Sequence, residues 1–224
     1  MQREEVALQA HGEEFDAELA VPDDPDGRGV AVMPGGGHGP WGDIFDRFAE
    51  DAAADGVHVI RFEGWPTPEV LMGKTVRDMH AELDAAVDRL REEGCTELGV
   101  VGKSFGGGVT LTHVPEGVDR VVLWAPAFVT FGDEETVSDS LDDSLEALKD
   151  APERRQISAA WMADFDASLR VIQGDEDDVR SVEHARKVVD AAPDAELVVR
   201  EGEDHSFRGD DREQEIVDQT LDFL

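Results

Sequence analysis

The sequence predicts an α/β fold, with a doubly wound, mostly parallel sheet of eight strands and helices on both faces. Strand-like and helix-like segments alternate along almost the whole chain, and most of the strand-like segments are short apolar runs, typical of strands buried on both faces. The 224 residues can bury one large core, and no internal repeat or low-complexity linker divides them. We therefore expect a single domain over residues 1–224.

The first two strands are expected to pair antiparallel. Apolar and acidic residues alternate over 15–21, and the segment Pro22–Gly27 that follows is rich in turn-forming residues. The later strands are separated by helices, which favours parallel pairing through right-handed crossovers. The predicted strands span residues 6–10, 15–21, 29–33, 57–62, 97–102, 118–124, 169–173 and 196–200.

The helices are predicted by apolar residues at helical spacing. The clearest predicted helix spans about 74–93 and ends before Gly94. Its apolar stripe consists of Val76, Met79, Leu83, Val87 and Leu90. Asp43 is expected to cap the first helix. Further helices are predicted from near Ser104, over 181–192 and over 213–224. The alternation breaks over 127–166, where acidic helical stretches at 140–149 and 156–163 predict a short helical lid over the C-terminal edge of the sheet.

Charge and composition exclude several classes of function. The chain has 53 acidic and 20 basic residues, a formal charge of −33, which would repel phosphate backbones and anionic lipids, so we expect neither nucleic-acid nor membrane partners. There is no spanning apolar run and no secretory signal, which favours a cytoplasmic location. The single cysteine, Cys95, excludes an internal disulfide and a cysteine-based zinc site.

The sharpest motif is Gly102-Lys103-Ser104-Phe105-Gly106, at the junction of a predicted strand and a predicted helix. This is the G-x-S-x-G pattern of a nucleophile elbow, in which a sharp turn projects the serine hydroxyl and glycines avoid collisions. A backbone N–H for stabilising an oxyanion is expected from Phe105, at the start of the helix.

A serine hydroxyl needs a base, and the base needs an acid to orient it. His205 follows the last predicted strand, and a run of carboxylates over 175–178 follows the preceding one. Both segments should lie at the C-terminal edge of the sheet, beside Ser104. The order along the chain is nucleophile, acid, histidine.

With these motifs the sequence resembles the α/β-hydrolase family over nearly its whole length, in particular small members with short lids such as dienelactone hydrolases and compact carboxylesterases. The resemblance implies the α/β-hydrolase fold and a serine hydrolase that cleaves a carboxylic ester or related acyl compound. It implies a small-molecule acyl substrate and no metal or organic cofactor. The family's dienelactone hydrolases carry cysteine at the nucleophile position, where this chain has Ser104.

The resemblance also assigns individual roles. The family's acid usually stands three residues after the glycine that ends its strand, here Gly174, which assigns the role to Asp177 and leaves Asp175 and Asp178 as alternatives. The family's histidine loop corresponds to the segment with His205. The second oxyanion donor normally comes from a loop that often begins His-Gly; here Pro34 stands in place of the histidine, which makes Gly36 the expected donor and Gly35 or Gly37 the alternatives.

Other interpretations of the motifs stay open. Gly37–Gly42 fits G-x-G-x-x-G, and Glu63 at the end of the next strand completes a dinucleotide-binding pattern, although Pro40 lies inside the loop. A hydrolase-fold binding protein with a vestigial triad is the second hypothesis for the function, and a dinucleotide-binding protein is the third. Five aromatic residues are expected either to line a pocket or to pack the lid onto the sheet: Trp41, Trp65, Phe128, Trp161 and Phe165.

The acidic residues are spread along the chain, with 16 Arg against 4 Lys and no tyrosine, a composition typical of proteins adapted to high salt. We expect the fold to be lost at low ionic strength, so that the melting transition differs between about 0.1 M and about 3 M KCl, because the screening length falls from about 10 Å to below about 3 Å. Thermal unfolding followed by circular dichroism measures this. A cooperative melting transition that is the same at both concentrations would contradict the expectation.

Overall fold

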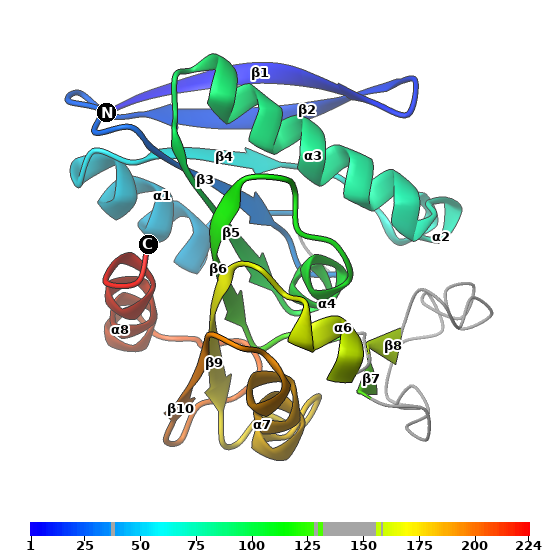
Figure 1. Ribbon diagram of the computed structural model, residues 1–224. Helices are drawn as coiled ribbons and strands as arrows, with labels where there is room; N and C mark the ends of the chain where they lie inside the picture. Colours follow the sequence, from blue (N-terminus) through cyan, green and yellow to red (C-terminus); the bar gives the residue numbers. More distant parts are fainter. Residues whose placement is uncertain (37–38, 128–129, 132–155, 158) are drawn as a thin grey trace.

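A computed structural model describes residues 1–36, 39–127, 130–131, 156–157 and 159–224 of the chain (Figure 1). Its main sheet has eight strands in the order β1-β2-β4-β3-β5-β6-β9-β10. β1 and β2 are antiparallel, β2 and β4 are antiparallel, and all other pairs are parallel, which confirms the predicted doubly wound sheet with an antiparallel start. The strands are β1 (Gln2–Ala10), β2 (Glu13–Val21), β3 (Arg28–Met33), β4 (His58–Phe62), β5 (Glu97–Lys103), β6 (Val118–Trp124), β9 (Ser168–Gly174) and β10 (Ala195–Arg200).

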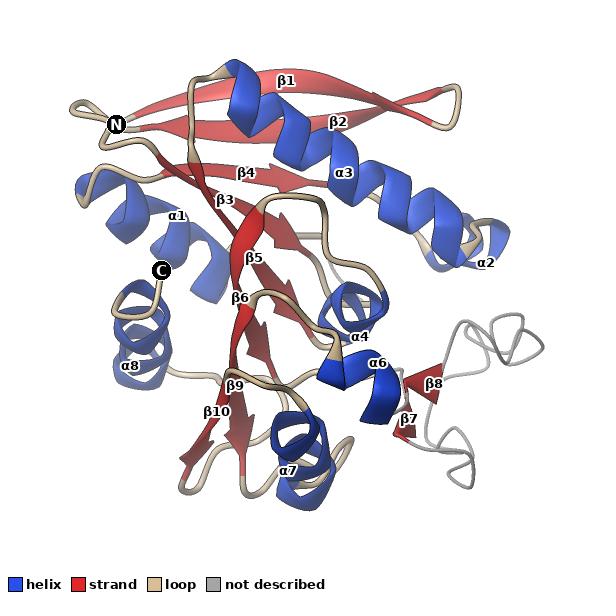
Figure 2. Ribbon diagram, viewed as in Figure 1, coloured by secondary structure: helices blue, strands red, loops and turns tan. Residues whose placement is uncertain are grey.

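Helices cover both faces of the sheet, as Figure 2 shows. Met79 of α3 and Val109 of α4 pack on one face, and Phe48 of α1 and Val217 of α8 pack on the other. The helices are α1 (Asp43–Ala54), α2 (Pro68–Gly73), α3 (Val76–Glu92), α4 (Phe105–Thr112), α6 (Ala159–Ala163), α7 (Val182–Ala191) and α8 (Asp210–Leu221).

The central strands are apolar throughout because both of their faces are buried. In β3, Ala31 belongs to the cluster beneath α3, whereas Val30 and Val32 belong to the cluster beneath α1, and all three are at most 2% exposed. Successive side chains of a strand point to opposite faces, so a strand between two helical layers needs apolar residues at consecutive positions.

Three helix starts differ from the sequence prediction, and one of them is that of α8, which begins at Asp210 rather than at 213. Gly42, with φ of 77°, is the N-cap of α1, and Asp43 is its first helical residue and provides no side-chain cap. The chain makes its turn into α1 over two residues with positive φ, Gly42 and Asp43, whose φ is 46°. Glycine adopts such a conformation freely, and aspartate is among the residues with a side chain that adopt it most often. α3 begins at Val76 rather than near 74, because Thr75 and Asp78 form a capping box, and the short helix α2 precedes it.

The expected lid over 127–166 is described only in part. Residues 156–157, predicted to begin a helix, form the strand β8 (Gln156–Ile157), which pairs in parallel with β7 (Thr130–Phe131). The helix α6 follows and packs against α7. The predicted helix over 140–149 lies outside the described residues, so the lid remains a prediction.

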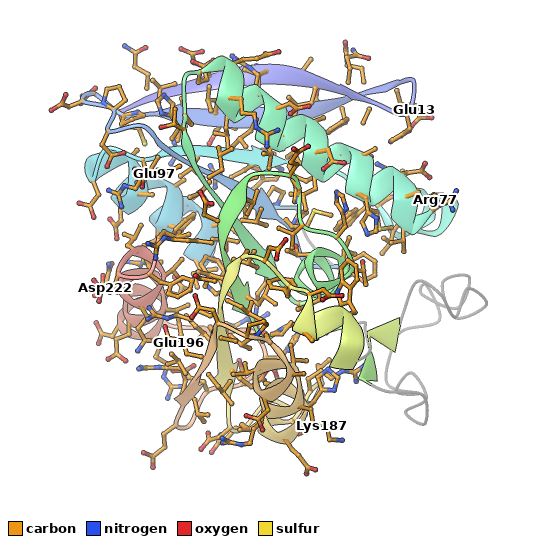
Figure 3. All side chains as sticks on the ribbon, viewed as in Figure 1. Glu13, Arg77, Glu97, Lys187, Glu196 and Asp222 are labelled. Atoms are coloured by element: carbon orange, nitrogen blue, oxygen red, sulfur yellow. The ribbon has the colours of Figure 1, made fainter. Side chains whose placement is uncertain are left out.

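Charged side chains project around the outline of the described part of the molecule (Figure 3). The labelled acidic residues Glu13, Glu97, Glu196 and Asp222 are exposed and belong to widely separated elements. The acidic charge is therefore distributed over the surface. None of the helices in the described ranges is long and apolar enough to cross a bilayer.

Candidate active site

The turn from β5 into α4 projects Ser104 from the sheet. Ser104 has φ of 50° and ψ of −116°, a strained conformation for a residue with a side chain, and it is the N-cap residue of α4. A Cβ atom on Gly106 would overlap the carbonyl oxygen of Pro34, and one on Gly102 would lie 2.7 Å from the Cα atom of Gly107. The glycines of the motif are therefore required by backbone packing.

The structure brings together Ser104, His205 and Asp177, which the sequence separates by 101 and 28 residues. His205 lies on the loop after β10, and Asp177 lies on the loop after β9. The Ser104 Oγ atom is 2.8 Å from His205 Nε2, and His205 Nδ1 is 2.8 Å from Asp177 Oδ2. The C-terminal ends of three parallel strands thus supply one continuous chain of hydrogen bonds.

The carboxylate of Asp177 is fully buried and accepts four hydrogen bonds. Its Oδ1 accepts from the backbone N–H groups of Val179 and Arg180, and its Oδ2 accepts from Gln173 Nε2 and His205. Burial alone raises the pKa of Asp177, but the hydrogen bond from His205 and the two backbone bonds outweigh it, so the pKa lies below its ordinary value. The carboxylate is ionised at neutral pH.

Ionisation of Asp177 determines the arrangement of protons in the site. An ionised carboxylate only accepts hydrogen bonds, so Nδ1 of His205 donates to it. In a neutral imidazole Nε2 is then the acceptor, and the Ser104 hydroxyl donates to it. A serine that donates to an imidazole held by a buried carboxylate can be deprotonated as it attacks an electrophile.

Neither alternative acid contacts the histidine. The Asp175 side chain accepts a hydrogen bond from the Gly202 backbone N–H at 2.7 Å, and Asp178 is exposed.

The loop after β10 that carries His205, the histidine loop, packs directly on the end of β9. A Cβ atom on Gly174 would overlap the carbonyl oxygen of Glu203, so this approach needs glycine.

Lys103, one residue before Ser104, is a part of the site that sequence reasoning missed. Its side chain is buried, donates a hydrogen bond to the backbone carbonyl of His205, and lies 4.3 Å from the ring centroid of Phe207. Burial lowers the pKa of Lys103 to about 7, while the charges of Asp177 and Asp204 act in the opposite direction. The G-x-S-x-G pattern leaves this position free, so no sequence signal marks it.

A cavity of about 500 Å³ opens beside Ser104 and His205. Trp41, Ile44 and Phe45 give it an apolar wall, and Arg208 lies among its polar lining residues. Of the other aromatic candidates, Trp65 and Phe165 are buried outside this lining, Trp161 is 44% exposed on α6, and Phe128 lies outside the described residues.

The glycine-rich loop after β3 lies against the elbow. A Cβ atom on Gly36 would lie 3.2 Å from Cβ of Phe105, and one on Gly35 would lie 3.7 Å from Cβ of Ser104. The backbones of Gly36 and Phe105 are therefore neighbours beside the hydroxyl. Gly37 lies outside the described residues.

Two observations bear on metal and dinucleotide binding: the acidic, histidine and cysteine side chains of the described residues, and the charge at the start of α1. In the part of the chain that the structure describes, no group of three or more His, Cys, Asp or Glu side chains could hold a metal ion. The first turn of α1 carries Asp43 and Asp46. A dinucleotide-binding loop places its pyrophosphate at this helix terminus, where two carboxylates would repel it.

Comparison with known proteins places the fold. No family model and no curated protein matches the sequence. A dienelactone hydrolase from Anabaena variabilis is 15% identical with a TM-score of 0.75, over 99% of this chain and 96% of that chain. Est1E from Butyrivibrio proteoclasticus, solved with bound ferulic acid, is 14% identical with a TM-score of 0.75, over 97% of each chain. A Pyrococcus furiosus esterase is 17% identical with a TM-score of 0.75, over 100% of this chain and 90% of that chain. The chain has the α/β-hydrolase fold, as the sequence predicted.

We expect Gly174→Ala to lower the free energy of unfolding by about 1–3 kcal/mol, because the added methyl group forces the histidine loop away from β9. Chemical denaturation measures the change. Gly73→Ala is the matched control, since a Cβ atom on Gly73 meets no atom within 4 Å. Equal stability of Gly174→Ala and the wild type would contradict the close approach.

The lowered pKa of Lys103 predicts a pH-dependent stability. Between about 7 and the ordinary value of 10.5, the unfolded chain binds a proton at Lys103 that the folded chain does not. The free energy of unfolding of the wild type, measured relative to Lys103→Met, should therefore rise over this pH range and be constant below it. Urea denaturation of both proteins between about pH 6 and about pH 10 tests this. A constant difference across the range would show that the amine titrates normally.

Proposed function

We propose that the chain is a serine hydrolase that cleaves a carboxylic ester or related acyl compound, with Ser104, His205 and Asp177 as its catalytic triad. The observation that carries the proposal is the continuous hydrogen-bond chain from the serine hydroxyl to a buried, ionised carboxylate, at 2.8 Å and 2.8 Å, beside an open cavity. The fold is shared with proteins named as dienelactone hydrolase and esterase, which supports the same chemistry.

In the first half of the proposed reaction, Ser104 Oγ attacks the acyl carbon while His205 Nε2 takes the hydroxyl proton. The carbonyl oxygen becomes an oxyanion, which accepts hydrogen bonds from the backbone N–H groups of Gly36 and Phe105. The tetrahedral intermediate collapses, the carbon–oxygen bond to the leaving group breaks, and His205 gives its proton to the departing alcohol.

In the second half, water attacks the acyl carbon of the Ser104 ester, and His205 accepts a proton from that water. Collapse of the second intermediate releases the carboxylic acid and returns the proton to Ser104. Throughout, Asp177 stays ionised and stabilises the imidazolium form of His205. Its lowered pKa and its four hydrogen bonds suit this role, because they keep the carboxylate fixed while the imidazole gains and loses a proton.

The proposal predicts a graded loss of activity. Ser104→Ala should lower kcat on the order of 10⁶-fold, and Asp177→Asn about 10⁴-fold, because the amide leaves the serine in place but cannot stabilise the imidazolium. Hydrolysis of a panel of p-nitrophenyl esters in molar KCl measures both. Ser168→Ala is the control, because Ser168 begins β9 at the opposite edge of the sheet from Ser104.

Labelling with a fluorophosphonate separates the proposal from a vestigial site. Only a serine activated by its base reacts quickly, so the wild type should be labelled and Ser104→Ala should not. Wild-type hydrolysis by Ser104→Ala would refute the mechanism. A wild type that is neither labelled nor active on the panel would favour a hydrolase-fold binding protein.

A further inference from the structure

Trp65 lies three residues after β4 and contacts both halves of the proposed oxyanion hole. Its indole Nε1 donates a hydrogen bond of 2.8 Å to the carbonyl oxygen of Gly35. Its ring packs edge-on against the ring of Phe105, with centroids 5.3 Å apart and planes at 86°. The side chain is only 4% exposed, and it is not part of the cavity lining described above. Trp65 therefore acts on the site through its neighbours.

The hydrogen bond to Gly35 determines the direction of the Gly36 N–H group. In a trans peptide the carbonyl and the N–H that it flanks point in opposite directions, and no described peptide bond is cis. Since the Gly35 carbonyl points to Trp65, the Gly36 N–H points to the other side of the loop. Gly35 and Gly36 both line the cavity with Ser104 and His205, whereas Trp65 does not, so the side of the peptide away from Trp65 is the side that faces the cavity.

Among the described residues, Trp65 supplies the side-chain hydrogen bond to this peptide. Glycine on both sides of it removes the steric limits that normally restrict φ and ψ, so the unit could rotate at low cost. Rotation would break the bond from Trp65 and leave a buried indole N–H without its acceptor, which is unfavourable. The Trp65 ring also packs against Phe105 at the start of α4, so Trp65 sets how closely the glycine-rich loop after β3 can approach α4.

We propose that Trp65 is a positioning residue that orients the Gly36 amide toward the oxyanion and holds it at a fixed distance from the Phe105 amide. The inference rests on the proposed function, because the oxyanion arises only in that reaction. It extends the functional site to a residue that touches neither the triad nor the substrate cavity.

Trp65→Phe tests the proposal because phenylalanine keeps an aromatic ring against Phe105 and removes the N–H donor. We expect kcat to fall about 10- to 100-fold while KM changes less than about twofold, since the Gly36 amide acts on the transition state rather than on the bound ester. The inhibition constant of phenylboronic acid, which forms a tetrahedral adduct with an activated serine, should rise by the same factor as kcat falls.

Trp161→Phe is the matched control. Trp161 Nε1 also donates to a backbone carbonyl, that of Leu111, at 2.7 Å, but near the far end of α4. The same chemical change there should leave kcat, KM and boronate inhibition unchanged. If Trp65 only supported the fold, Trp65→Phe would lower the melting temperature without a selective loss of kcat and boronate affinity, and that result would overturn the proposal.

A readout that does not depend on turnover separates this inference from the proposed function. In ¹⁵N relaxation, the order parameter of the Gly36 amide should fall in Trp65→Phe and stay constant in Trp161→Phe. An inactive, unlabelled wild type with that fall would reject the hydrolase, and with it the oxyanion, but would still show that Trp65 orders the Gly36 amide. An active wild type, together with unchanged kcat and unchanged Gly36 order in Trp65→Phe, would reject the role of Trp65 and leave the hydrolase intact.

Discussion

Close backbone packing around Ser104 is the constraint on which the site depends. α4 can begin directly after β5 only because Gly106 carries no side chain where the Pro34 carbonyl passes, and because Gly102 allows Gly107 to approach. The resulting turn holds Ser104 at a positive φ with its hydroxyl directed out of the sheet. It also places the Phe105 backbone beside Gly36, so one turn sets both the proposed nucleophile and its neighbouring amides. The strain at Ser104 is offset by the core that β5 and α4 share.

A second group of contacts fixes the histidine loop. Gly174 lets this loop lie on the end of β9, and Lys103 holds the His205 carbonyl from the side of the elbow. An amine and a carboxylate, those of Lys103 and Asp177, are thus buried close to His205 in a molecule whose other ionisable side chains lie mostly at its surface. Lys103 holds the backbone carbonyl of His205, and Asp177 holds its imidazole ring. Together the two hydrogen bonds reduce the conformational freedom of the histidine.

The sequence predicted the sheet well because apolar runs and helical stripes record burial directly. It also marked Ser104, His205 and the segment with Asp177, because loops after parallel strands meet at one edge. It did not distinguish Asp177 from its neighbours by pattern, since that choice depends on the backbone N–H groups of Val179 and Arg180. The contacts of Lys103 and Trp65 come from segments distant in the chain, which local patterns do not contain. The strand at 156–157 likewise forms only because Thr130–Phe131 lies beside it.

The neighbourhood of Gly35 and Gly36 has a consequence for genetic approaches to this protein. Every amino acid except proline supplies the same main-chain donor, so exchanging residues at 36 or 105 alters shape before it removes a donor. In a saturation library, substitutions of the serine, the histidine and the aspartate would change activity strongly. No substitution except proline would remove the N–H of the peptide group between the two glycines, so the library would give little information on that group. Replacing that single amide by an ester through semisynthesis is the change that addresses it directly.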